Sequence, residues 1–159
     1  MAIDHETLMR VAMEDARRAG AEGNLAVGSV VVRDGRVIGR GRNRVTSTRD
    51  PTDHAETIAL REAARALGGA DLSGCDLYTT IESCPMCCGA VMKSGIRTLV
   101  MGARFRPEEF ASQRFGAYSV EKLIDLARWG DRLGVVTGVL SQECYEIRRD
   151  WESRNTRGA

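Results

Sequence analysis

The sequence predicts a three-layer α/β/α sandwich in which a mixed five-stranded sheet lies between helices. A β-hairpin near the N-terminus is followed by strands and helices that alternate to the end of the chain. Such alternation is typical of parallel strands whose crossover helices cover both faces of a sheet. The length of 159 residues suits one domain with its own core, so we expect a single domain over residues 1–159.

The N-terminal part of the chain predicts a helix and a hairpin. Residues 4–19 place apolar side chains at helical spacing on one face, and Gly20 suits the end of that helix. Two β-rich runs within residues 26–41 flank Asp34 and Gly35, a pair typical of a two-residue turn between antiparallel strands. The apolar face of the helix consists of Leu8, Val11, Ala12, Ala16 and Ala19.

The rest of the chain alternates between strand and helix patterns. Residues that can cap a helix, or a proline in the first turn, mark the expected helix starts, and glycines follow several expected ends. The segment 103–118 lacks a clear pattern. After a loop over 43–52, the expected elements are helix 52–67, strand 75–81, helix 84–94, strand 98–102, helix 119–129, strand 135–140 and a last helix from 141.

Composition argues against several classes of protein. The formal net charge of +1 gives no strong electrostatic reason to expect a nucleic-acid or membrane partner. No window approaches a membrane span, and the N-terminus is too polar and acidic for a signal peptide, so we expect a cytoplasmic protein. The five cysteines are odd in number and partly clustered, which in a reducing compartment favours metal binding or catalysis over disulfides.

His54, Cys84 and Cys87 predict a zinc site. The two cysteines are three residues apart at an expected helix start, so their sulfurs point the same way, and the helix N-terminus favours thiolates. A lone Cys-x-x-Cys pair is ambiguous between redox and metal chemistry, but His54 at another helix start favours metal. Three protein ligands leave the fourth tetrahedral position of zinc for water, which is the catalytic arrangement.

Glu56 is the expected general base. It lies two residues after His54, and its carboxylate can approach a water on the metal without binding the metal, provided that His54 caps the helix. There it can take a proton from the water and later return it to a leaving group. Taken alone, His54 and Glu56 would instead be read as a surface pair at a helix cap.

The other cysteines are expected to be structural. Neighbouring residues on a helix point about 100° apart, so Cys87 and Cys88 should not share one metal. We expect Cys88 to pack as a small hydrophobic residue, and we expect the same of Cys75 and Cys144.

The motif HAE at 54–56, followed by CPMC at 84–87, resembles the signature of the cytidine-deaminase-like zinc hydrolases. The resemblance is good over about residues 5–105 and weak elsewhere, and it favours the branch that contains cytosine, guanine and bacterial tRNA adenosine deaminases. It implies the fold of that family, one Zn²⁺ per chain, hydrolytic deamination, and a homodimer with the active site near the interface. The similar segments are 26–44, 50–56 and 76–103.

The resemblance also assigns roles to residues. Asn43 would hold the base through side-chain hydrogen bonds, although it could also serve only its own turn. The Ala55 backbone N–H and the Glu82 carbonyl would contact the polar edge of the base, and Val27 matches a hairpin position of the fungal-type cytosine deaminases. Ser83 replaces the family's usual proline, and we expect its hydroxyl to cap the following helix and to add a polar group near the substrate.

The features that select the substrate are harder to recognise. In the family, an activated water attacks the ring carbon that bears an exocyclic amine, and Glu56 would move protons to the ring and to ammonia. The segment GARFRPEEF at 102–110 breaks the pattern of tRNA-editing members, and the pattern of guanine deaminases is also missing. We therefore expect a small free nucleobase-like substrate, of cytosine or guanine type with cytosine slightly preferred. The alternatives are deamination of tRNA adenosine and a non-enzymatic, zinc-stabilised module.

Arginines and aromatic residues in the last third of the chain leave two interpretations open. The arginines alternate with acidic residues, which favours a solvated face over an RNA track. The aromatic residues could stack on a planar base or pack in the core. The arginines are Arg148, Arg149, Arg154 and Arg157, and the aromatic residues are Phe105, Phe110, Phe115 and Trp129.

Overall fold

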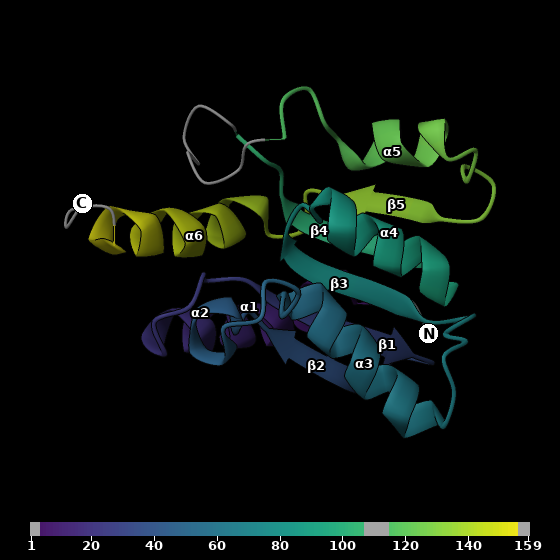
Figure 1. The fold of residues 1–159 in the computed structure, drawn as a ribbon, viewed down its shortest axis with the longest axis horizontal. Helices are drawn as coiled ribbons and strands as arrows, with labels where there is room; N and C mark the ends of the chain where they lie inside the picture. Colours follow the sequence, from purple (N-terminus) through teal and green to yellow (C-terminus); the bar gives the residue numbers. More distant parts are fainter. Residues whose placement is uncertain (1–3, 107–114, 156–159) are drawn as a thin grey trace.

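The computed structural model describes residues 4–106 and 115–155, and the predicted five-stranded sheet lies at its centre (Figure 1). Its strands lie in the order β2-β1-β3-β4-β5. Strand β1 is antiparallel to both neighbours, whereas β3, β4 and β5 run parallel. The prediction of a mixed sheet is confirmed. The strands are β1 (Gly28–Arg33), β2 (Arg36–Arg42), β3 (Asp76–Ile81), β4 (Thr98–Ala103) and β5 (Gly134–Thr137).

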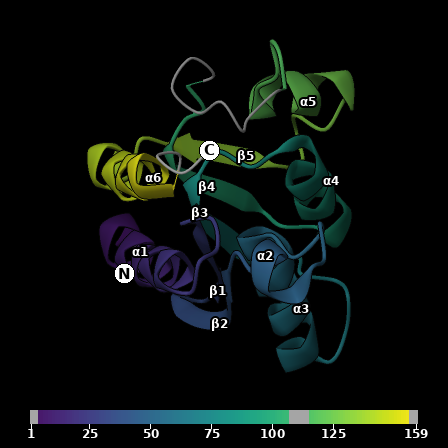
Figure 2. The same cartoon turned by 60° about the vertical axis from the view of Figure 1, so that its left-hand side comes forward.

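Helices cover both faces of the sheet, which gives the predicted three layers. The helices are α1 (His5–Ala21), α2 (Val45–Thr48), α3 (Ala55–Leu67), α4 (Pro85–Ser94), α5 (Val120–Leu126) and α6 (Ser141–Asn155). Helices α1 and α6 lie on one face of the sheet, and α3, α4 and α5 lie on the other (Figure 2). Within the described residues, none of these helices combines the length and hydrophobicity that a membrane span needs.

Each face of the sheet contributes to its own hydrophobic core. Val30 and Tyr78 point toward α1 and α6, whereas Val31 and Leu77 point toward α3, α4 and α5. Neighbouring residues of a strand point to opposite faces, so one strand supplies both cores. All six residues of the central strand β3 are buried as a result. This strand ends beside the candidate site.

Left-handed backbone conformations place the turn and the helix ends as predicted. Asp34 and Gly35 have φ angles of 51° and 75°, which a two-residue turn between antiparallel strands requires. Helix α3 ends at Gly68, with φ 71°, and α4 ends at Gly95, with φ 79°.

Four elements differ from the expectation. Helix α3 begins at Ala55, with His54 as its N-cap, rather than at 52. The loop after the hairpin contains the short helix α2. Helix α5 ends at Leu126 rather than at 129, because Arg128 has a φ of 54° that a right-handed helix cannot contain. Strand β5 ends at Thr137, because Gly138 has a φ of 86° and turns the chain away from the sheet before α6.

Glycines in β2 allow α3 to approach the sheet closely. A Cβ atom at Gly41 would lie only 2.0 Å from the carbonyl oxygen of Ala55. A Cβ atom at Gly39 would lie 2.4 Å from the carbonyl oxygen of Ala59. Only glycine permits such an approach of two backbones. Strand β2 therefore helps to set the position of the N-terminus of α3.

Gly41→Ala should destabilise the protein strongly, because the new methyl group would overlap the first residue of α3. We expect the free energy of unfolding, measured by urea denaturation, to fall by about 3 kcal/mol. Gly69→Ala is the matched control, because no atom lies within 4 Å of a Cβ at Gly69. Its effect should stay within about 0.5 kcal/mol. Equal losses in the two variants would contradict this account of the packing of α3.

Candidate active site

Two helices begin near each other at the edge of the sheet where β3 ends. His54 is the N-cap of α3, with φ −73° and ψ 156°. Cys84 is the N-cap of α4, with φ −67° and ψ 168°, and Pro85 occupies a first-turn position where it costs no hydrogen bond. Cys87 follows in the first turn of α4. The extended backbone of an N-cap releases its side chain from the helical direction, as the motif requires of His54.

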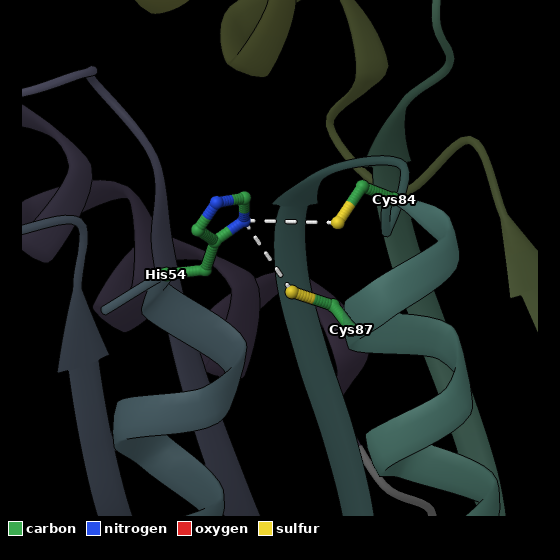
Figure 3. Close-up of side chains that lie close together, drawn as sticks. All are labelled: His54, Cys84 and Cys87. Atoms are coloured by element: carbon green, nitrogen blue, oxygen red, sulfur yellow. Dashed lines mark hydrogen bonds between the residues drawn. The ribbon is translucent and has the colours of Figure 1, made fainter. Parts of the chain in front are cut away.

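Three ligand atoms converge between these helices, as Figure 3 shows. The Nδ1 atom of His54 is 3.7 Å from the Sγ atom of Cys84 and 3.5 Å from that of Cys87. All three ligand atoms lie within 4.8 Å of one another. A tetrahedral zinc, with bonds of about 2.3 Å to sulfur and about 2.1 Å to nitrogen, holds such atoms about 3.6 Å apart. The three residues therefore fit zinc, with one tetrahedral position left for another ligand.

Acidic groups crowd around this point. A hydrogen bond with Cys87, joined by one with His54, lowers the pKa of Cys84 to about 4. The contact with Cys84, together with burial, raises the pKa of Cys87. The hydrogen bond with Cys84 also raises the pKa of His54. A divalent cation would neutralise this cluster and hold both sulfurs as thiolates.

Glu56 lies beside the three ligand residues in the first turn of α3. It is almost fully buried, with 4% of its surface exposed. Burial, followed by the negative charge of Cys84, raises the pKa of its carboxyl group. Among the described residues, the group of potential ligands contains only His54, Cys84 and Cys87, so Glu56 stands outside it. This placement suits proton transfer near the metal position rather than ligation.

A cavity opens over this cluster. Three of the predicted substrate-contact residues, Val27, Asn43 and Glu82, line it. The other two, Ala55 and Ser83, are not among the described residues that line it. The full set of lining residues is Leu25, Val27, Asn43, His54, Glu56, Ile81, Glu82, Cys84 and Phe105.

The apolar walls of the cavity contain two residues that the sequence analysis did not single out. Leu25 precedes Val27 by two positions, in a tight turn where the Val27 N–H donates to the Leu25 carbonyl at 2.8 Å. Ile81 directly precedes Glu82 at the end of the buried strand β3. The sequence could have indicated these two residues only through their position close to residues already predicted to contact the substrate. The sequence allowed Phe105 either to stack on a base or to pack in the core. In the structure Phe105 also forms part of the cavity wall.

The side chain of Asn43 serves both the turn and the cavity. Its Oδ1 atom accepts a hydrogen bond from the Val45 N–H at 3.2 Å, and its own backbone N–H donates to the Val27 carbonyl at 3.0 Å. Within the described part of the chain, no group accepts a hydrogen bond from its Nδ2 atom. The turn therefore uses the oxygen and leaves the amide N–H groups available to a ligand.

Ser83 does not cap α4, and that expectation was wrong. Helix α4 begins after Cys84, so Ser83 lies one residue too early for its hydroxyl to reach the first free N–H groups. The hydroxyl is buried without a hydrogen-bond partner among the described residues. The Ser83 carbonyl, by contrast, accepts a hydrogen bond from the Tyr118 hydroxyl at 2.7 Å.

The remaining cysteines are structural, as predicted. Cys75 and Cys88 pack in the core beneath α3, α4 and α5, and Cys144 packs in the opposite core. All three are buried as free thiols. Burial raises the pKa of Cys88 to about 11 and that of Cys144 to about 12, which keeps these thiols protonated and unreactive.

The prediction of a solvated arginine face was wrong for Arg148. This residue is fully buried, and its guanidinium group bonds to Glu152 one turn later and lies 5.6 Å from the Trp151 ring centre. Arg149 and Arg154 are exposed as predicted, whereas Arg157 lies outside the described residues.

The aromatic residues separate into two groups. Phe105 and Phe115 contact each other beside the cavity, with ring centres 5.9 Å apart. Trp129 packs instead against the core of α3, α4 and α5, so it is not placed to stack on a base. Phe110 lies outside the described residues.

The site geometry and the fold agree with comparisons to known proteins. The chain belongs to the family described as the cytidine and deoxycytidylate deaminase zinc-binding region, whose model matches residues 2–103. The family is zinc-binding, which confirms the predicted cofactor, and its members are zinc hydrolases that act on C–N bonds. The predicted resemblance to cytidine-deaminase-like proteins is thereby confirmed as well.

Two relatives illustrate the sequence similarity. The chain is 40% identical over 142 residues to the tRNA-specific adenosine deaminase of Haemophilus influenzae, and the match covers 89% of this chain and 79% of that protein. It is 45% identical over 98 residues to the chloroplastic tRNA(adenine(34)) deaminase of Arabidopsis thaliana. That match covers 62% of this chain but only 8% of the much longer relative.

Two solved structures illustrate the structural similarity. One comes from a study of A-to-I editing by tRNA:A34 deaminases, with a TM-score of 0.71, 35% identity, and coverage of 89% of this chain and 98% of that one. The other is a guanine deaminase from Nitrosomonas europaea, with a TM-score of 0.82, 29% identity, and coverage of 96% and 87%.

Removal of the metal should make one thiol reactive and leave four protected. With zinc bound, we expect none of the five cysteines to react with a thiol reagent at neutral pH without denaturant. After chelation, Cys84 should react as a thiolate, because its pKa is lowered to about 4. Cys87 is fully buried and has a raised pKa, so it should stay protected together with the core cysteines. Thiol titration alongside measured zinc release tests this. Reaction of every cysteine would show that the metal holds the whole fold together, as a non-enzymatic zinc module requires.

Proposed function

We propose that this chain is a tRNA adenosine deaminase, which converts adenosine at the wobble position of a tRNA to inosine. The observation that carries the chemistry is the set of three ligand residues that leaves one position on zinc, next to a buried carboxylate in a cavity. The choice of substrate is supported by similarity over most of the chain to proteins named for that activity.

The reaction needs little beyond the residues of the cavity. Bound by His54, Cys84 and Cys87, zinc supplies a Lewis acid that makes a water molecule nucleophilic near neutral pH. Glu56 would take a proton from the attacking water and deliver it to the ring nitrogen as the water oxygen bonds to carbon 6 of the adenine. A further transfer through Glu56 releases the amino group, so adenosine and water give inosine and ammonia.

The groups that line the cavity suit contacts with a planar base. The Nδ2 atom of Asn43 donates a hydrogen bond to an acceptor of the ring. Leu25, Ile81 and Phe105 provide apolar surfaces for the ring faces and edges. The raised pKa of Glu56 suits a group that must both accept and return a proton during one turnover.

From the sequence we expected a free base of cytosine or guanine type, with cytosine slightly preferred, as the main substrate and tRNA adenosine as the alternative, and the relatives support the reverse order. A free base is therefore the second candidate, with guanine as its best-supported form. The guanine deaminase gives the higher TM-score, 0.82 against 0.71. Sequence identity has the opposite order, 29% against 35%. We place tRNA first because side chains rather than the backbone path select a substrate.

The deciding experiment measures product formation by the purified, zinc-loaded protein on a small panel. The panel contains an anticodon stem-loop RNA with adenosine at the wobble position, the same RNA with guanosine there, free adenosine, guanine and cytosine. Formation of inosine in the adenosine stem-loop alone supports the proposal. Turnover of guanine or cytosine without turnover of the stem-loop contradicts it.

Glu56→Gln should abolish turnover while leaving the fold and the zinc intact. The amide cannot exchange protons, so we expect kcat to fall by about 10³-fold or more. Inosine formation, zinc content and thermal unfolding are measured together. Glu62→Gln is the matched control, because Glu62 is exposed on the same helix. Full activity in the Glu56 variant would contradict the assignment.

Activity on the stem-loop should depend steeply on salt. Contacts with about four phosphates predict that kcat/KM falls by at least about tenfold between 50 and 200 mM salt, because counterions compete for the same positions. Turnover of an uncharged free base should be nearly independent of salt. A salt-independent rate on the RNA would contradict recognition through its backbone.

A further inference from the structure

The carboxylate of Glu82 is buried at a position that joins the metal site to the wall of the cavity. Glu82 follows β3 directly and precedes the ligand residue Cys84 by two positions. Only 4% of its surface is exposed. A buried carboxylate is strongly unfavourable unless hydrogen bonds or opposite charges satisfy both of its oxygens. The partners of these oxygens therefore show what the side chain holds in place.

Both oxygens are used, and their partners lie far apart in the sequence. Oε2 accepts a hydrogen bond from the backbone N–H of Phe105 at 3.0 Å. Oε1 accepts one from the backbone N–H of Val120, the first residue of α5, at 3.1 Å. Oε1 also lies 3.0 Å from Nη2 of Arg104. One side chain thus ties the chain just after β4 to the start of α5.

Phe105 and Glu82 both line the cavity, and Phe105 supplies the aromatic ring of its wall. The Phe105 ring centre is 6.3 Å from that of Tyr118, whose hydroxyl donates to the Ser83 carbonyl. The loop that carries Cys84 and the backbone that carries Phe105 are therefore joined by directed hydrogen bonds. Apolar contacts alone would fix the ring less closely.

A second ion pair nearby offers a matched comparison. Arg104 also makes a two-pronged pair with Glu121, with distances of 2.7 and 2.6 Å. The Glu121 side chain is half-exposed, whereas the Glu82 side chain is almost fully buried. Both carboxylates bind Arg104, but only Glu82 also accepts the hydrogen bond from the Phe105 backbone N–H.

We propose that the side chain of Glu82 is a positioning residue that holds Phe105 in the wall of the base-binding cavity. The proposal rests on the deaminase activity proposed above and applies to a base in RNA or a free base alike. Glu82 acts through Phe105 and takes no part in the chemical step. Its loss should weaken substrate binding more than it slows the reaction.

Glu82→Gln tests the proposal with a side chain of the same shape. The amide keeps one acceptor and turns an NH₂ group toward a donor, so one of the hydrogen bonds is lost. We expect KM for the adenosine stem-loop to rise about tenfold or more, with kcat changed less than about threefold and zinc content unchanged. Glu121→Gln should change KM less than about twofold. An unchanged KM in Glu82→Gln, or an equal rise in both variants, overturns the proposal.

A double-mutant cycle separates positioning from a general loss of stability. Phe105→Ala removes the ring but keeps the backbone N–H that Glu82 binds, so it should raise KM by itself. Adding Glu82→Gln to Phe105→Ala should then raise KM no further. If the rise in KM of the double variant equals the product of the rises in the two single variants, Glu82 acts independently of Phe105. The proposal would then be wrong.

Amide hydrogen exchange provides a readout that needs no substrate. In Glu82→Gln the backbone N–H groups of Phe105 and Val120 should exchange faster, while those of the central strand stay protected. Unchanged exchange at Phe105 overturns the proposal, whatever the substrate is. Should Glu82→Gln fail to fold, Glu82→Asp keeps the charge but is one methylene shorter, and the same shifts in KM and exchange are expected.

The two proposals fail in different ways. If the wild-type protein deaminates guanine and leaves the stem-loop unchanged, the proposed RNA activity is wrong, and the KM comparisons are made with guanine. An unchanged KM for guanine in Glu82→Gln then overturns the positioning role. A rise in that KM, with faster exchange at Phe105, supports it.

Discussion

The convergence of two helix N-termini at one edge of the sheet is the constraint on which the rest of the site depends. His54 and Cys84 are both N-caps, yet neither side chain caps its own helix. Each side chain is therefore available to a metal ion. The positive ends of both helix dipoles also point toward the cluster, which opposes the effect of burial that raises the pKa of Glu56. Glu56 and Cys87 occupy the first turns of these helices, so the ligands and the proton-transfer group share one electrostatic environment.

The sheet sets the distance between these two helix starts. Helix α3 packs on the hairpin strands, and α4 follows β3, so the antiparallel pairing of β1 with β3 connects the two halves of the site. In that pairing Ser29 lies opposite Thr79. A slip of one residue would turn the side chains of a strand to the opposite face and would disrupt both cores. Because the cores enforce the register, the spacing of the ligand atoms is a consequence of the fold, which the bound metal then stabilises further.

The parts of the site that depend on local sequence could be predicted, and the parts that depend on distant contacts could not. The motifs at 54–56 and 84–87 place His54 and Cys84 at helix N-caps and Cys87 in a first turn, so the ligand set was predictable from local sequence. The role of Ser83 depended on a helix boundary that differs by one residue. Arg148 pairs with Glu152 on the buried side of α6, and the same charge pattern arises on a solvated face. The contacts of the Glu82 carboxylate depend on segments that meet only in the folded chain.

The cavity itself offers little to distinguish one aminated ring from another. With the oxygen of Asn43 engaged by the Val45 N–H, its amide presents only a donor, and adenine, guanine and cytosine all carry acceptors that could receive it. The apolar walls distinguish rings that differ by one small group by only about 10- to 200-fold. Contacts outside the cavity can therefore add to the selection of a substrate. A nucleic acid supplies such contacts through its phosphates and neighbouring bases, whereas a free base does not. On this argument the same metal site can serve relatives named for guanine and for tRNA adenosine, and the surfaces around the cavity help to decide between them.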